Sequence, residues 1–172
     1  TYTPIKPKQL TARYQKKINS TINFLDKHLP EVKDNYNEPI LTISGIQNIQ
    51  DKIIEVIQNA KHEIYMEVWS QDFKVFEKEL LNAYNRNVEI RIVGYDNFNS
   101  RFGLVFEHAF ARDIEMSLGG RMIIIAADDS EGVVGKISSL KNDISDTNII
   151  WTKNKGIVFI IKEFIVHDIC LL

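Results

Sequence analysis

The sequence is poor in cysteine and in net positive charge, and it lacks long apolar runs. Its single cysteine, Cys170, excludes an internal disulfide framework and a cysteine-rich metal site, which favours an intracellular protein. Its 21 Lys and Arg against 23 Asp and Glu give a net charge of −2, which disfavours a nucleic-acid-binding surface within this chain. Apolar runs such as residues 157–161 are too short to cross a bilayer. No basic-then-apolar leader opens the chain, so we expect a cytoplasmic protein without membrane contact.

The N-terminal third of the chain predicts an amphipathic helix between two irregular segments. Residues 1–8 hold two prolines and are expected to be extended, and residues 30–39 are polar and turn-rich, as in a linker. Residues 9–29 place apolar side chains at steps of three and four. Such a helix has little stability alone, so it either folds back on the chain or pairs with the same helix of a second copy. We favour pairing, which predicts a homodimer formed through residues 9–29.

From residue 40 onwards, predicted strands and helices alternate. Strands are expected at residues 40–44, 63–69, 88–93, 121–127, 133–137 and 149–151, and helices at 48–60, 73–85 and 157–171. Residues 128–132 form the turn of a hairpin, and residues 102–118 are expected to be part loop and part helix. The alternation predicts an α/β fold around a mostly parallel or mixed sheet.

Three segments resemble one known family. They are GIQNIQDKIIEVIQNAKHEIYMEVWSQDF (residues 45–73), EHAFARDIEMSLGGRMIIIAADDSEGVVG (107–135) and IIWTKNKGIVFIIKEFIVHDICL (149–171). Together they resemble the effector domain of TrmB-type transcriptional regulators, and the helix at 9–29 resembles their dimerising connecting helix. The resemblance implies a phospholipase-D-like mixed sheet flanked by helices, with an effector-sensing domain at residues 40–172. Family members carry a winged-helix DNA-binding domain ahead of that helix. We expect DNA to be contacted only through such a domain, which is not in this chain.

The phospholipase D superfamily requires His-x-Lys-x-x-x-x-Asp, followed seven residues later by Gly. Asp128 and Gly135 have this spacing, but the His and Lys positions hold Arg121 and Ile123. A guanidinium stays protonated and cannot attack phosphorus, and an aliphatic chain cannot stabilise a phosphoryl transition state. We therefore expect no catalytic residues and no enzyme activity, with Asp128 and Gly135 serving turn geometry and close approach. The alternatives are a ligand-free dimerisation domain and, less favoured, a phosphodiesterase.

Effector binding is expected beyond the carboxyl ends of the strands, where α/β sheets form their crevices. The candidate ligand-binding residues are Trp69, Ser70, Asp96, His108 and Arg121. A tryptophan can stack on a sugar or base, while serine and aspartate supply orienting hydrogen bonds. A sugar or another metabolite would then act by shifting the balance between two dimer arrangements.

Each candidate also has a purely structural interpretation. Trp69 could be core, Asp96 a solvated loop residue and His108 a surface or hinge histidine. Arg121 could pair with a carboxylate such as Glu67 or Asp128, because a buried unpaired charge is costly.

The remaining residues with chemical potential are expected to be structural. The four histidines lack metal-ligand spacing, so no metal site and no cofactor are predicted. Cys170 is expected in the core and Trp151 against the final helix, while Asn154 suits the turn into that helix.

Overall fold

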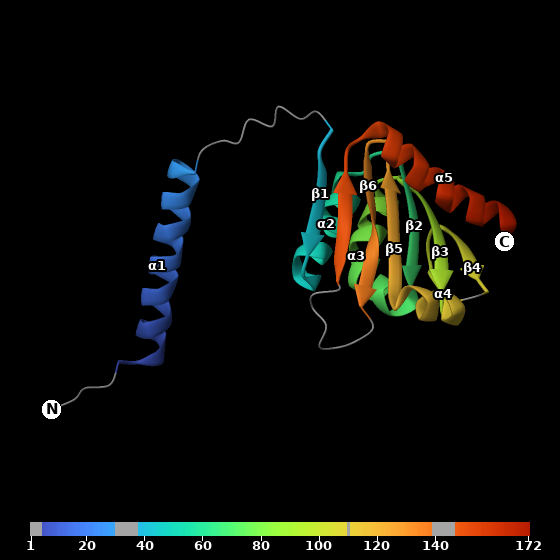
Figure 1. The fold of residues 1–172 in the computed structure, drawn as a ribbon. Coiled ribbons are helices and arrows are strands. Elements are labelled where there is room, and N and C mark those ends of the chain that lie inside the picture. Colours follow the sequence, from blue (N-terminus) through green and yellow to red (C-terminus); the bar gives the residue numbers. More distant parts are fainter. Residues whose placement is uncertain (1–4, 30–37, 110, 139–146) are drawn as a thin grey trace. The chain divides into compact units, whose positions relative to one another are not determined.

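The computed structural model describes residues 5–29, 38–109, 111–138 and 147–172, which fall into two compact units, residues 1–35 and 36–172 (Figure 1). The described part of the first unit is one helix, α1 (Pro7–His28). The predicted helix thus begins two residues early, because proline fits the first helical turn, where its missing N–H costs nothing. Pro7 and Lys8 therefore do not belong to an extended segment. Most of the predicted linker, residues 30–37, lies outside the described residues.

The second unit is a seven-stranded mixed sheet with four helices, as the α/β prediction required. Its elements are β1 (Ile40–Ser44), α2 (Ile46–Asn59), β2 (Glu63–Trp69), α3 (Ser70–Asn85), β3 (Glu89–Tyr95), β4 (Leu104–His108), α4 (Ala111–Leu118), β5 (Gly120–Ala127), β6 (Glu131–Ser138), β7 (Asn148–Thr152) and α5 (Lys155–Leu171). The strand order is β1-β7-β6-β5-β2-β3-β4. Strands β2, β3 and β4 are parallel, whereas the pairs β2–β5, β5–β6, β6–β7 and β1–β7 are antiparallel.

Strand alternation divides the core between the two faces of this sheet. Helices α2 and α3 cover one face and α5 crosses the other, with α4 at the end where the parallel strands finish (Figure 1). On β2, Ile64, Met66 and Val68 join the larger core under α2 and α3. Tyr65, which lies between Ile64 and Met66, points to the other face and packs with Ile161 and Ile165 of α5. Successive residues of one strand therefore reach different layers.

Three expectations from the sequence are wrong. Residues 102–118 contain a strand, β4, which the sequence signals only by the short apolar run 104–106. Trp151 does not pack against the final helix: it belongs to the core under α2, with Lys52 Nζ 4.5 Å from its ring centroid. Cys170 is exposed rather than core, because α5 turns it away from the sheet. Asn154 does cap α5, accepting a hydrogen bond from the Ile157 N–H.

Asp128 and Gly135 have the structural roles expected of them. Asp128 takes a left-handed turn conformation (φ 52°) and accepts hydrogen bonds from the backbone N–H groups of residues 61, 62 and 63, at 2.6, 2.8 and 2.9 Å. At Gly135, an added Cβ would lie 2.4 Å from the Asn148 carbonyl oxygen, so the strands β6 and β7 approach too closely for a side chain. Both residues therefore have structural roles that account for their presence in the sequence.

Candidate functional site

The carboxyl ends of the three parallel strands carry a row of aromatic side chains on the α5 face. Trp69, Tyr95 and His108 are register partners on β2, β3 and β4. The Trp69 and Tyr95 rings stack with centroids 5.2 Å apart, and the Tyr95 and His108 rings lie 5.0 Å apart. Trp69 is buried, 3% exposed, and its Nε1 has no hydrogen-bond partner among the described residues. The row places two predicted site residues, Trp69 and His108, on either side of Tyr95.

A fully buried carboxyl group, Glu67, lies two residues before Trp69 and on the same face of β2. The Tyr95 hydroxyl donates a hydrogen bond to Glu67 Oε2 at 3.0 Å, and no described group donates one to Oε1. Burial, together with the nearby Asp168 carboxylate of α5, raises the pKa of Glu67 to about 8. Glu67 is therefore mostly protonated at neutral pH, which lets it face Asp168 without repulsion.

An open cavity of about 670 Å³ lies beside this cluster, between the sheet, α4 and α5. The strands contribute Tyr95, His108 and Met122, α4 contributes Asp113, Ile114, Ser117 and Leu118, and α5 contributes Phe164 and Asp168. His108 Nε2 lies 3.9 Å from Asp168 Oδ2 across the cavity wall. The wall thus combines an apolar surface with a few polar groups, as small-molecule sites do.

A second hollow of about 420 Å³ adjoins the cavity at His108 and Asp113. It also includes Asp96, which is exposed and has a left-handed backbone conformation (φ 67°). Asp96 therefore lies beside the cavity rather than in it. Its conformation fits the turn that ends β3.

Arg121 lies on the opposite face of the sheet from this cavity. Its Nε and NH2 groups donate hydrogen bonds to the two carboxylate oxygens of Asp72 in the first turn of α3, at 2.7 and 3.1 Å. The predicted carboxylate pairing is thus present, but the partner is Asp72 and neither Glu67 nor Asp128. Ser70 begins the same helix. The five candidates consequently do not converge, and only His108 lines the cavity.

Sequence reasoning overlooked the carboxylate pair Glu67 and Asp168 and the apolar wall from α4. A signal was present for Glu67, because a charged residue at an inward position of the strand EIYMEVW requires a partner or a proton. No comparable signal marks α4, since its contact with the sheet depends on the tertiary fold.

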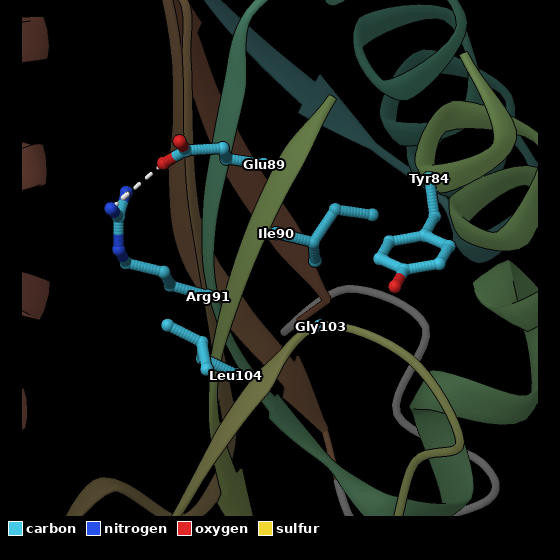
Figure 2. Close-up of a pocket in the computed structure, with 6 residues that line it drawn as sticks. All are labelled: Tyr84, Glu89, Ile90, Arg91, Gly103 and Leu104. Atoms are coloured by element: carbon cyan, nitrogen blue, oxygen red, sulfur yellow. Dashed lines mark hydrogen bonds and ion pairs between the residues drawn. The ribbon is translucent and has the colours of Figure 1, made fainter. Parts of the chain in front are cut away.

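Another hollow, of about 360 Å³, lies at the edge of the sheet near the start of β3 (Figure 2). Tyr84 and Ile90 line it from one side of the strand, and Arg91 and Leu104 from the other. The Arg91 charge is engaged, because its NH2 donates to Glu89 at 2.8 Å and its NH1 to the Tyr65 hydroxyl at 2.8 Å. This hollow contains none of the predicted site residues and has no buried polar group, so it is the weaker candidate.

The described parts of the chain contain neither a candidate metal site nor a candidate membrane-spanning helix. Within residues 5–29, 38–109, 111–138 and 147–172, no group of three His, Cys, Asp or Glu side chains could hold a metal ion. In the same residues, no helix is both long and apolar enough to span a bilayer.

Comparison with known proteins identifies relatives over nearly the whole chain. A family model described as the transcriptional regulator TrmB, N-terminal subdomain of the effector-binding domain, matches residues 39–167. The uncharacterised protein YrhO of Bacillus subtilis (strain 168) is 33% identical over 173 residues, covering 99% of this chain and 62% of that protein.

Solved structures share the fold at low sequence identity. TrmBL2, an archaeal chromatin protein described as having a novel mode of DNA binding, superposes with a TM-score of 0.57 at 16% identity, covering 93% of this chain and 63% of that one. NucT from Helicobacter pylori gives a TM-score of 0.53 at 12% identity, covering 76% and 94%. Nuc, a phospholipase D family member from Salmonella typhimurium, gives 0.50 at 15%, covering 76% and 91%. The chain thus spans less than two thirds of YrhO and TrmBL2, and its sheet is of the phospholipase D type.

Proposed function

The chain belongs to the TrmB family of transcriptional regulators, and we propose that residues 40–172 are a non-catalytic module that binds a small-molecule effector in the cavity between the sheet, α4 and α5. The observation that carries this proposal is the position of that cavity. It lies where the parallel strands β3 and β4 end, the usual place for ligands in α/β sheets. Its volume of about 670 Å³ suits a metabolite.

The absence of catalysis is supported by the surroundings of the two positions that would need His and Lys. Arg121 is held by Asp72, and Ile123 is buried in the core under α2 and α3, 1% exposed. Neither side chain can attack or clamp a phosphodiester. Turnover of bis(p-nitrophenyl) phosphate above background, retained after removal of trace nucleases, would contradict this part of the proposal.

Signal transmission is proposed to run through a homodimer formed by α1. Along α1 the side chains of Leu10, Tyr14, Ile18, Ile22 and Leu25, continued by Leu29 at its C-terminal end, form one apolar stripe. The stripe can be covered either by the rest of the chain or by a second copy, and we propose the second copy because it offers an identical stripe. An effector that favours one dimer arrangement would then alter the spacing of DNA-binding parts outside this chain.

The dimer can be tested by sedimentation of matched variants. We expect the full chain to be a dimer, a chain beginning at Leu41 to be a monomer, and Ile18→Lys to weaken the dimer strongly. Lys16→Ala, on the face of α1 opposite the apolar stripe, should have no effect. A monomer in every case, or a dimer that survives removal of residues 1–40, would refute pairing through α1.

Effector binding can be tested by a thermal-shift screen with neutral, anionic and cationic metabolites, sugars included. A true ligand should raise the melting temperature of the native chain, because it binds only the folded state. Ser117→Phe fills the cavity from α4 and should abolish the shift, while Gln47→Phe, exposed on α2, should preserve it. A compound that stabilises both variants equally binds elsewhere, and a screen without any stabilising compound favours the ligand-free dimerisation domain.

A further inference from the structure

The wall of the cavity proposed for the effector contains both carboxylates and apolar side chains. Asp113 of α4 and Asp168 of α5 both line it, and Glu67 lies directly behind Asp168 and Tyr95. Ile114, Leu118 and Met122 provide the apolar part of the wall. The carboxylates therefore lie beside a surface on which the body of a ligand can be desolvated.

Positive charge does not balance these carboxylates within the cavity. Among the described residues that line it there is no lysine and no arginine, and His108 is the one side chain able to carry a positive charge. In the adjoining hollow, Arg112 is accompanied by Asp96, Glu107 and Asp113. The Arg121 guanidinium faces the other side of the sheet, where Asp72 neutralises it. An anionic ligand would therefore meet net repulsion in this cavity.

An aromatic side chain of the wall suits a cation as well. Phe164 lines the cavity and is exposed, and an aromatic face attracts a positively charged group through its quadrupole. A cationic N–H group at Asp168 would pair with the carboxylate that keeps its charge beside the protonated Glu67.

From this arrangement, and resting on the effector function proposed above, we infer that the ligand of the cavity is an organic cation with an apolar body, such as a primary or quaternary amine on a hydrocarbon or aromatic frame. The ammonium group lies between the carboxylates of Asp113 and Asp168. The apolar body lies against Ile114, Leu118 and Met122. Neutral polyols and phosphorylated sugars have neither of these two features.

Three probes with one carbon frame and different charges test this inference. They are 4-phenylbutylamine, 4-phenylbutan-1-ol and 4-phenylbutyrate, titrated into the full chain by calorimetry at neutral pH. We expect the amine to bind about tenfold more tightly than the alcohol, and the carboxylate to bind most weakly.

Two charge-removing variants locate the effect. Asp113→Asn should lower the affinity for the amine several-fold and leave the alcohol unchanged, since it removes one exposed carboxylate from the cavity. Asp51→Asn removes an equally exposed carboxylate from α2 and should change neither affinity. Because both positions are on the surface, neither substitution threatens folding.

Each remaining result decides against the inference. Equal affinity for the amine and the alcohol, tighter binding of the carboxylate, or an equal response of the two variants would overturn the cationic class. Binding of the alcohol or the carboxylate that is as tight as that of the amine, and that disappears in Ser117→Phe, would overturn it while leaving the effector function intact. If none of the three probes binds at millimolar concentration the inference fails, and the separate metabolite screen then decides the fate of the effector function.

Discussion

Replacing Glu67 by glutamine tests the buried carboxyl group that joins the sheet to α5. Burial, assisted by Asp168, raises the pKa of Glu67 from its ordinary value of 4.5 to about 8. The folded state therefore binds a proton that the unfolded state releases between these two values. By linkage, this contribution to stability is fully present below the lower pKa and is lost as the pH rises through the higher one.

The size of the effect follows from the width of that window. One proton changes the free energy of unfolding by about 1.4 kcal/mol per pH unit. Between about pH 6 and pH 8 the native protein should lose roughly 2 kcal/mol, or about 4 to 8 °C in melting temperature for a domain of this size. Glu67→Gln mimics the protonated carboxyl and keeps an acceptor for the Tyr95 hydroxyl. It should match the native protein near pH 4, below the lower pKa, and exceed its stability by an amount that grows as the pH rises to about 8.

Urea unfolding at a series of pH values measures this difference, and Asp168→Asn provides the matched control. Removing the Asp168 charge should lower the pKa of Glu67. The pH-dependent loss of stability should then end at a lower pH than in the native protein. Parallel pH profiles for the native protein and Glu67→Gln would refute the reasoning, because they would mean that Glu67 titrates alike in the folded and unfolded states.

Three further experiments probe the framework around the site, and urea unfolding measures the stability of each variant. The Asp128 carboxylate accepts hydrogen bonds from three backbone N–H groups, and Asp128→Asn replaces one of its oxygens by an NH₂ group that cannot accept. We expect a loss of about 2 kcal/mol in the free energy of unfolding. An unchanged urea midpoint would contradict this role. Gly135→Ala should cost about 1 to 3 kcal/mol because its Cβ meets the β7 backbone, whereas Gly156→Ala, in open helix, should be neutral or stabilising. Asp72→Asn and Arg121→Gln should be strongly non-additive in a double-mutant cycle, since each single change removes the bidentate pair and leaves the other half-buried group without it; additive costs would show that the pair does not interact.

The sequence predicts the framework of this fold better than it predicts the site. Periodicity identifies the buried strands β2, β3 and β5 and the helices α2, α3 and α5 because each hides a regular set of apolar residues. Strand β4 escapes prediction because it is a short edge strand whose burial depends on Tyr95 and the loop before it. The register that aligns Trp69, Tyr95 and His108 depends on tertiary pairing, which no local pattern encodes.

The misplacement of Arg121 has a simple geometric cause. Arg121 and Met122 are neighbours in sequence, yet strand alternation sends the first to Asp72 of α3 and the second into the cavity under α5. The sequence-based prediction places Arg121 in one pocket with His108, although the two side chains lie on opposite faces of the sheet. The structure instead separates the positions corresponding to phosphodiesterase chemistry from the proposed effector cavity by the thickness of the sheet.

This separation leads to a last prediction, that restoring the missing catalytic residues does not restore chemistry. Arg121→His with Ile123→Lys would recreate the required spacing with Asp128. However, Ile123 is 1% exposed and packed in the core under α2 and α3, so an ammonium group there would be buried without a partner. We expect the double variant to lose more than about 3 kcal/mol of stability and to show no hydrolysis of bis(p-nitrophenyl) phosphate. Ile123→Met, which keeps the volume without the charge, should fold normally. A stable double variant with measurable turnover would show that the core opens to water at this strand, and that catalysis was lost here through two side chains alone rather than through the packing around them.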